Sequence, residues 1–161
     1  MILLVMGVTG SGKTTVGKLL AQRLGWLFLD ADDFHPAENI EKMKRGVPLR
    51  DEDREPWLAA IHAELLKCAA KKRDAVLACL ALKQSYRERL GAGVELRICY
   101  LKGTYREIVA RQQSRRGHFA GETILAGQFA DLEEPRDALV LRVSETPEEI
   151  VGDVLRKLKL G

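Results

Sequence analysis

The sequence predicts an α/β fold in which helices cover both faces of a five-stranded parallel sheet. Two observations lead to this fold class. Short apolar runs of strand length alternate along the chain with amphipathic stretches of helix length, and no internal repeat or linker interrupts them. A glycine-rich turn also joins the first apolar run directly to the first helical stretch, as is common in parallel α/β sheets. With 161 residues, the chain has the size of one domain, covering residues 1–161.

The elements follow from hydrophobic periodicity. Strands are expected at residues 2–6, 26–29, 75–81, 96–101 and 138–143. Helices are expected at residues 13–24, 37–45, 54–72, 83–90, 104–115 and 147–159. Because helical stretches separate these strands, right-handed crossovers place the carboxyl ends of all strands at one edge of the sheet, which is where such sheets bind ligands.

Composition and charge indicate an ordinary globular protein. Hydrophobic residues make up 46% of the chain and charged residues 30%, which suits a single core of normal size. The net charge of +3 suits an anionic substrate but is too small for a dedicated nucleic-acid binder, so no nucleic-acid partner is expected. The apolar residues 1–6 are too few for a membrane span or a signal peptide. The three cysteines lack metal-site spacing, which favours reduced thiols and a cytoplasmic protein.

The strongest signal is a phosphate-binding loop, or P-loop, at residues 7–14, which match G-x-x-x-x-G-K-[ST] between a strand and a helix. Glycines let backbone N–H groups turn inward on phosphate oxygens, and the helix N-terminus adds a favourable dipole. We expect Lys13 to reach the β- and γ-phosphates of ATP and the Thr14 hydroxyl to coordinate Mg²⁺. The expected nucleotide-binding residues of the loop are Gly7, Val8, Thr9, Gly10, Ser11, Gly12, Lys13 and Thr14.

Acidic residues after the second strand narrow the reaction class. A P-loop alone does not separate kinases from GTPases or motor ATPases. The chain lacks the guanine-reading N-K-x-D motif, and its later strands are followed by Lys83 and Lys102 rather than by the acid of a Walker B motif. Acids follow the second strand instead, at Asp30, Asp32 and Asp33. An Asp at this position can orient an acceptor hydroxyl and take its proton, which favours a small-molecule kinase.

Longer motifs resemble the gluconokinase family over nearly the whole chain. They include H-P-x-x-N-I-x-K-M at residues 35–43, D-x-D-R-x-P-W-L at 51–58, A-L-K at 81–83, and Q-F and L-E-E-P at 128–129 and 132–135. This resemblance implies an adenylate-kinase-like P-loop kinase fold that phosphorylates D-gluconate at its 6-hydroxyl with ATP and Mg²⁺. It also implies a homodimer.

The resemblance implies roles for two of the acids after the second strand. Asp32 is expected as a catalytic and acceptor-binding residue near the acceptor hydroxyl, and Asp30 is expected to support it or the metal. The two side chains point to the same side if the strand continues through residue 32. A solvated turn or a helix cap is the alternative for each of these acids.

The resemblance also assigns three acceptor-binding residues with basic side chains. Arg54 is expected to clamp the gluconate carboxylate, because its planar fork suits bidentate recognition. His35 and Lys83 are expected to add hydrogen bonds to hydroxyls or to the carboxylate. The alternatives are an ion pair of Arg54 with Asp51 or Asp53, a helix start at His35, and a solvated Lys83.

Two segments break the alternation of strands and helices: residues 33–57, expected to bind the acceptor, and residues 111–127, expected to form a lid. Arg111 and Arg115 lie four residues apart and share a helix face. The resemblance implies that Arg111 packs on the adenine and that Arg115 acts catalytically at the transferring phosphates, where its charge offsets developing negative charge. Gly117 is a candidate hinge. A solvated basic face is the alternative.

Two positions depart from the family pattern and leave the acceptor open. Leu80 stands where the family commonly has Ser, and Arg50 where Thr or Asn is common. The nearest rival is a shikimate-kinase-like or other sugar-acid kinase, although a shikimate kinase is expected to carry a Gly-Gly pair that residues 78–81 lack. A non-catalytic nucleotide-binding regulator is the rival from another class, and the intact Lys13 and Asp32 disfavour it.

Overall fold

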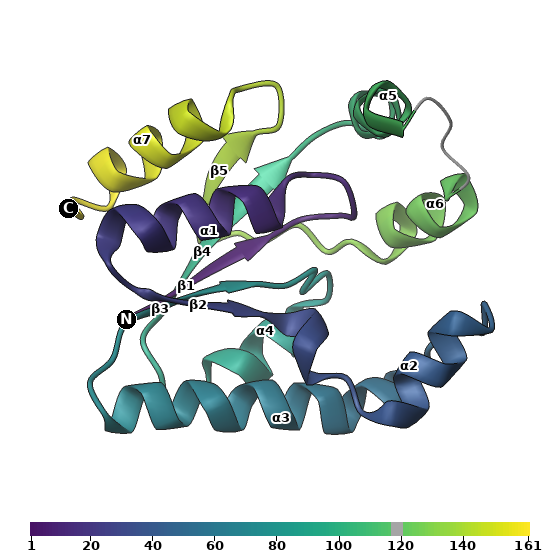
Figure 1. Cartoon of the computed structure of the whole chain (residues 1–161), viewed down its shortest axis with the longest axis horizontal. Helices are drawn as coiled ribbons and strands as arrows, with labels where there is room; N and C mark the ends of the chain where they lie inside the picture. Colours follow the sequence, from purple (N-terminus) through teal and green to yellow (C-terminus); the bar gives the residue numbers. More distant parts are fainter. Residues whose placement is uncertain (117–120) are drawn as a thin grey trace.

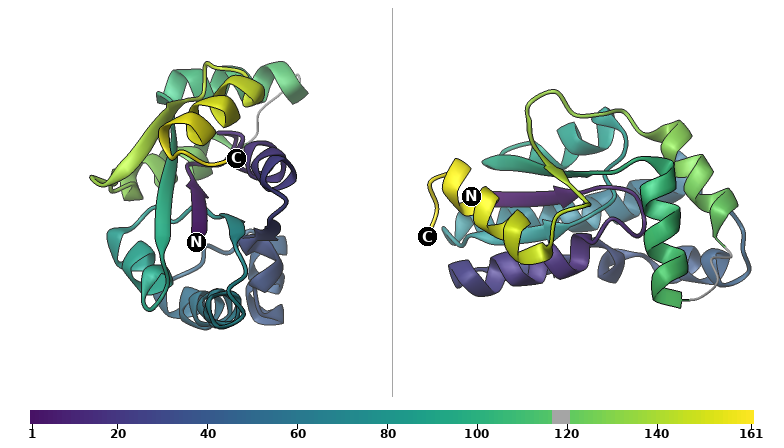
Figure 2. Two further views of the ribbon diagram at one scale, coloured as in Figure 1. Left: turned by 90° about the vertical axis from the view of Figure 1, so that its left-hand side faces the viewer. Right: turned by 90° about the horizontal axis from the view of Figure 1, so that it is seen from above.

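The computed structural model describes residues 1–116 and 121–161, and it confirms the predicted fold class. A five-stranded sheet has the strand order β2-β3-β1-β4-β5, and all neighbouring strands run parallel (Figure 1). The strands are β1 (Ile2–Met6), β2 (Leu27–Asp30), β3 (Ala75–Ala78), β4 (Leu96–Lys102) and β5 (Ala138–Arg142). Helices cover both faces, as Figure 2 also shows.

The helices form two layers and a group at one edge of the sheet. On one face lie α1 (Lys13–Leu24) and α7 (Pro147–Lys157), and on the other lie α3 (Asp51–Ala70) and α4 (Gln84–Gly91). Beyond the carboxyl ends of the strands lie the 3₁₀ helix η1 (Ala31–Phe34), α2 (Ala37–Lys44), α5 (Tyr105–Arg116) and α6 (Glu122–Asp131). Within the described ranges, no helix is long and apolar enough to cross a membrane.

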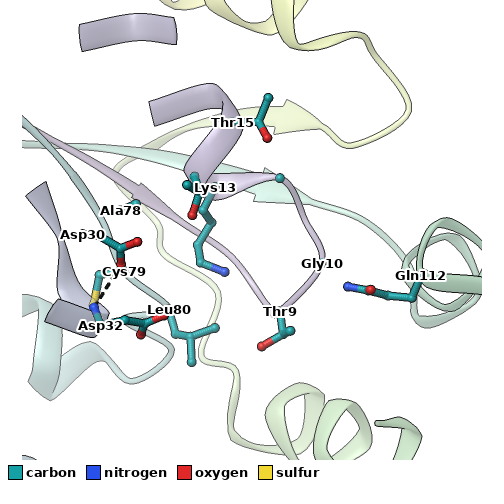
Figure 3. Close-up of a pocket in the computed structure, with 12 residues that line it drawn as sticks. Thr9, Gly10, Lys13, Thr15, Asp30, Asp32, Ala78, Cys79, Leu80 and Gln112 are labelled. Atoms are coloured by element: carbon teal, nitrogen blue, oxygen red, sulfur yellow. Dashed lines mark hydrogen bonds between the residues drawn. The ribbon is translucent and has the colours of Figure 1, made fainter. Parts of the chain in front are cut away.

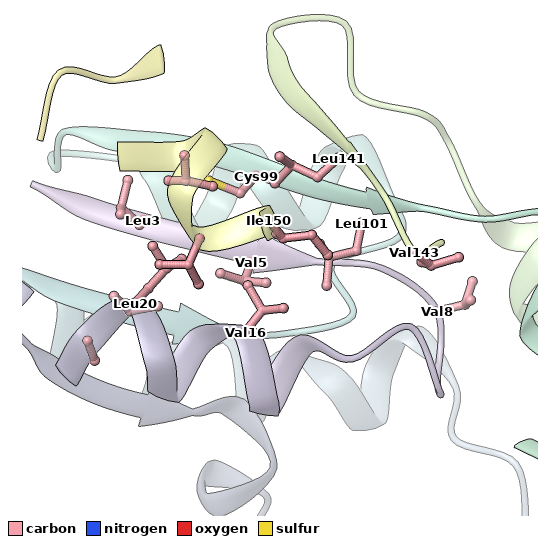
Figure 4. Close-up of a cluster of buried hydrophobic side chains, with 14 of the residues drawn as sticks. Leu3, Val5, Val8, Val16, Leu20, Cys99, Leu101, Leu141, Val143 and Ile150 are labelled. Atoms are coloured by element: carbon pink, nitrogen blue, oxygen red, sulfur yellow. The ribbon is translucent and has the colours of Figure 1, made fainter. Parts of the chain in front are cut away.

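The central strand β1 is buried along its whole length, and its side chains belong to two hydrophobic cores, one on each face of the sheet. Leu3 and Val5 pack with residues of α1 and α7, as Figure 4 shows. Ile2, Leu4 and Met6 pack on the opposite face with residues of α3 and α4. A parallel strand that is buried on both faces needs apolar side chains at every position, so its sequence is a continuous hydrophobic run. The loop that follows β1 is therefore held at its start by the most deeply buried strand.

The elements differ from those expected in three main respects. Strand β3 ends at Ala78 rather than at residue 81, because Ala81 has a φ of +46°, which strand geometry does not allow. Helix α3 begins at Asp51 rather than at residue 54, and the Arg50 N–H donates to Asp53 Oδ2 at 2.9 Å to support this start. Helix α6 was not expected as a helix, and most of it falls within residues 111–127, which were predicted to form a lid.

Candidate active site

The P-loop takes a conformation that requires glycine. Gly10 and Gly12 have φ values of +87° and +98°, in the left-handed region that other residues rarely adopt. A Cβ atom on Gly10 would also lie 1.8 Å from the side-chain nitrogen of Gln112. Helix α1 begins directly after Gly12, so the positive end of its dipole points toward the carboxyl edge of the sheet.

A cavity of about 610 Å³ opens at this edge (Figure 3). Residues of the P-loop, β2, η1, the loop after β3 and α5 line it: Thr9, Gly10, Gly12, Lys13, Thr14, Thr15, Asp30, Asp32, Ala78, Cys79, Leu80 and Gln112. The structure thus brings Lys13, Thr14, Asp30 and Asp32 together, as the sequence predicted. Leu80 also lines the cavity and adds an apolar side chain beside these polar groups.

Lys13 points into this cavity, between Asp30 and Thr9 in Figure 3. Its Nζ donates to the Val8 carbonyl oxygen at 3.1 Å. Burial lowers the pKa of Lys13, while the carboxylates of Asp32 and Asp30 oppose this shift. A partly desolvated ammonium group interacts more strongly with a phosphate than a fully hydrated one, so this position suits phosphate binding.

The acids after β2 reach the cavity by a route other than the one expected. The strand ends at Asp30 and does not continue through residue 32, because the chain turns into η1. Asp30 caps that helix: its Oδ1 accepts a hydrogen bond of 3.0 Å from the Asp32 N–H. The indole Nε1 of Trp57 donates to the Ala31 carbonyl oxygen at 2.7 Å and fixes η1 against α3. The two carboxylates therefore line one cavity although they do not share a strand face.

The three residues with basic side chains that were expected to bind the acceptor do not line this cavity. His35 stacks on Trp57 with ring centroids 4.6 Å apart. Burial lowers the pKa of His35, which Asp32 opposes and Arg54 reinforces. Lys83 donates to both oxygens of the Asp51 carboxylate, at 3.0 and 3.3 Å.

Arg54 lies in the same group, which we call the Asp51 cluster: Asp51, Arg54, Lys83 and Tyr86. Arg54 Nη1 lies 3.5 Å from Asp51 Oδ1, so the ion pair considered as an alternative does form. Tyr86 donates a short hydrogen bond to Asp51 Oδ1, which lowers the pKa of Asp51 more than the bond from Lys83 does. The bond to Asp51 in turn raises the pKa of Lys83. Two cationic groups and one phenol therefore converge on one carboxylate.

The two lid arginines differ in what the structure describes. Arg111 Nη1 donates to the Val143 carbonyl oxygen at 3.0 Å, and its Nε donates to that of Gly10 at 3.4 Å. Arg111 also lines a second cavity of about 140 Å³ beside the P-loop, together with Glu145 and Pro147. Arg115 belongs to α5, but its side chain lies outside the described part of the chain, as does the candidate hinge Gly117.

The shikimate kinase family model matches residues 9–159. The chain is 44% identical to a gluconokinase of Gluconobacter oxydans, over 96% of this chain and 89% of that relative. It is 43% identical to a probable gluconokinase of Mus musculus, over 98% of this chain and 97% of the relative. A gluconokinase crystal structure from Sinorhizobium meliloti superposes with a TM-score of 0.88 at 40% identity, over 98% of this chain and 90% of the other.

The chain belongs to the gluconokinase family. It is therefore a nucleotide-binding kinase of carbohydrate metabolism. A solved structure of an APS kinase from Mycobacterium tuberculosis superposes with a TM-score of 0.71 at 19% identity, over 98% of this chain and 96% of the other, and this likeness shows the shared fold alone.

In this member of the gluconokinase family, a glutamine whose role the sequence did not indicate links α6 to the P-loop. Gln128 Oε1 accepts from the Thr9 N–H, and Gln128 Nε2 donates to the Thr9 hydroxyl, both at 2.8 Å. Gln112 of α5 packs against Gly10 from the other side. Two helices that overlap the expected lid segment thus contact adjacent residues of the P-loop. No spacing rule predicts such contacts, because 119 residues separate Gln128 from Thr9.

A second link that the sequence did not indicate joins the segment after α6 to the loop after β3. The guanidinium group of Arg87 is 2% exposed and donates to the carbonyl oxygens of Ala81 and Glu133, at 2.6 and 2.7 Å. Glu133 also accepts from the Gln84 N–H at 2.8 Å and so caps the start of α4. Its own N–H donates to the Leu82 carbonyl oxygen at 2.9 Å. Glu133 is therefore fixed by three hydrogen bonds.

Proposed function

We propose that this protein transfers the γ-phosphate of ATP to the 6-hydroxyl of D-gluconate and so forms 6-phospho-D-gluconate. The single observation that carries the proposal is the placement of Lys13 and Asp32 in one cavity of about 610 Å³, in a chain whose full-length relatives are gluconokinases. A phosphate-binding cation and a carboxylate that accepts a proton are the two groups that a small-molecule kinase must bring together.

The donor binds to the P-loop. Its inward-turned N–H groups and Lys13 hold the β- and γ-phosphates, and the dipole of α1 adds to their attraction. The oxygen donors Thr14 and Asp30 line the same cavity and fit Mg²⁺, which takes a hydroxyl or one or two carboxylates along with phosphate oxygens. When bound, Mg²⁺ offsets the charge that develops on the phosphates.

The acceptor binds on the Asp32 side of the cavity. Asp32 orients the 6-hydroxyl and accepts its proton while the hydroxyl oxygen forms a bond to the γ-phosphorus in line with the bond that breaks to ADP. In this proposal Arg54 clamps the gluconate carboxylate at the far end of the acceptor, and Lys83 adds a hydrogen bond to the carboxylate or to a hydroxyl. His35, stacked on Trp57, adds a hydrogen bond to a hydroxyl.

Residues 33–57 act as the acceptor-binding segment and residues 111–127 as a lid. In this proposal Arg111 packs on the adenine from the cavity of about 140 Å³, which adjoins the P-loop. Arg115 approaches the transferring phosphate, where a cation offsets developing charge. Closure of the lid excludes water that would otherwise accept the phosphate.

The proposal is tested by coupled ADP release with D-gluconate, shikimate, other sugar acids and nucleoside monophosphates as acceptors. We expect turnover on D-gluconate well above that on the other compounds, and phosphate at the 6-position of the product by NMR. The match to the shikimate kinase family model makes a shikimate-kinase-like activity the second candidate. Turnover on shikimate in preference to gluconate would overturn the assignment.

Two further properties belong to the same proposal. The enzyme acts in the cytoplasm, and the buried, unpaired Cys68, Cys79 and Cys99 support a reducing environment. It also forms a homodimer, as the resemblance to its family implies. Light scattering on a size-exclusion column measures the mass directly, and a mass near the 18.0 kDa of one chain contradicts the dimer.

A further inference from the structure

Arg54 has more donors than partners in the Asp51 cluster. A guanidinium group carries five N–H donors in a fixed fork. Within the described part of the chain, the one hydrogen bond from this group is that of Nη1 to the Tyr86 hydroxyl, at 3.4 Å. Its approach to Asp51 Oδ1, at 3.5 Å, uses the same nitrogen. The fork is therefore left able to bind a carboxylate in the bidentate manner that arginine favours.

Asp51 is held by groups that suit any carboxylate. Lys83, Tyr86 and Arg54 all approach it, although its side chain is 65% exposed. Ion pairs with this much solvent contact are weak, because water screens the charges and competes for the donors. Asp51 can leave the cluster by rotating into solvent, and two cationic groups then remain for another anion.

We propose that Asp51 occupies, in the empty enzyme, the position that the carboxylate of the acceptor takes when it binds. Asp51 is then a specificity-determining residue. An acceptor with a carboxylate replaces one anion by another at Arg54 and Lys83, whereas a neutral sugar must leave the Asp51 ion pairs in place. This inference rests on the proposed function and names the part of the site that recognises a sugar acid.

The charge of Asp51 also has a second effect, which the test must separate from the first. Asp51 lies in the first turn of α3, where a negative charge interacts favourably with the helix dipole. Glu52 lies in the same turn, is exposed, and has no ion pair or side-chain hydrogen bond to the described residues. Glu52→Gln therefore removes one negative charge from the same helix end without touching the cluster.

The experiment measures the Michaelis constant for D-gluconate in Asp51→Asn, Asp51→Ala and Glu52→Gln beside the unsubstituted enzyme. Removing a carboxylate that competes for exposed cations should lower this constant about two- to fivefold in both Asp51 variants. The turnover number should stay within about twofold, because Asp51 does not line the cavity where phosphate is transferred. In Glu52→Gln the Michaelis constant should fall less than in either Asp51 variant, because the side chain of Glu52 does not contact the cluster.

Two results would overturn the inference. A raised Michaelis constant in the Asp51 variants would mean that Asp51 positions the cations for the acceptor rather than competing with it. An equal fall in Glu52→Gln would mean that the effect comes from the net charge of the helix end. Calorimetric titration with D-gluconate in the absence of ATP measures the same exchange without turnover. Tighter binding of D-gluconate by Asp51→Asn supports the inference whether or not the unsubstituted enzyme phosphorylates gluconate. Failure to phosphorylate gluconate would refute only the proposed function.

Discussion

The indole of Trp57 connects the stability of the fold with the position of Asp32, and Trp57→Phe tests this connection. The substitution keeps an aromatic ring in the buried space between α3 and η1 but removes the Nε1–H group. That group donates to the Ala31 carbonyl oxygen at 2.7 Å, one residue before Asp32. The substitution therefore leaves a buried carbonyl group without its partner in the segment that places the proposed catalytic base.

The size of the effect follows from that lost partner. A buried polar group left unsatisfied costs about 1–3 kcal/mol of stability. In a protein of this length, each kcal/mol shifts the midpoint of thermal unfolding by about 2–4 °C. We therefore expect Tm to fall by roughly 2–12 °C. Because η1 loses its tie to α3, the turnover number with the acceptor should fall at temperatures where the protein is still folded.

The assay is thermal unfolding followed by circular dichroism, with steady-state kinetics well below Tm. Trp26→Phe is the matched control, since it makes the same change in a half-buried indole that has no side-chain hydrogen bond to the described residues. If Trp57→Phe lowered Tm no more than Trp26→Phe does, the hydrogen bond to Ala31 would contribute nothing. An unchanged turnover number would show that η1 needs no support from α3.

Three other substitutions test the site directly. Asp32→Asn should lower the turnover number by about 10²–10⁴-fold, the usual contribution of a general base, while the dissociation constant for ATP stays within about twofold; loss of ATP affinity with residual turnover would contradict the assigned role. Gly10→Ala should weaken ATP binding by about tenfold or more in calorimetry, because it places a side chain at a φ of +87° and against Gln112. Gly152→Ala is its control, since a Cβ there meets no atom within 4 Å and should slightly stabilise α7. The third substitution is His35→Phe. Because burial lowers the pKa of His35 below 6.5, the unfolded chain binds more protons than the folded one when the pH falls through that value. Tm should therefore decrease as the pH is lowered from about 7.5 to about 5.5, and His35→Phe should reduce that decrease.

The sequence was most informative where local rules decide the structure. The buried run of β1 and the glycines of the P-loop follow from hydrophobicity and from backbone conformation, and both were predicted at the right residues. Local rules failed at the end of β3, where Ala81 adopts a positive φ and its carbonyl oxygen accepts a hydrogen bond from the distant Arg87. They failed again at α6, where tertiary contacts such as the Gln128 bonds to Thr9 outweigh the weak propensity around Gly127.

The candidate site was predictable in part for the same reason. Lys13 and Asp32 come to one cavity because the carboxyl ends of parallel strands meet at one edge, which strand order along the chain implies. Lys83 lies directly before α4 and Tyr86 within it, and both converge on Asp51 of α3, which is 32 and 35 residues away along the chain. Such pairings depend on how α3 and α4 pack together, and no pattern in the sequence reports that packing.

The buried Arg87 restrains the chain at the carboxyl end of α6. Its bonds to Ala81 and Glu133 fasten the chain just after α6 to the rigid sheet. The backbone at Glu133 is thus fixed relative to the sheet, unlike a free chain end. Any displacement of α6 relative to the sheet would therefore be taken up on the N-terminal side of Glu133 and would be smallest next to that anchor. Gln128 lies near this end, so its hydrogen bonds to Thr9 would be among the parts of α6 that are displaced least.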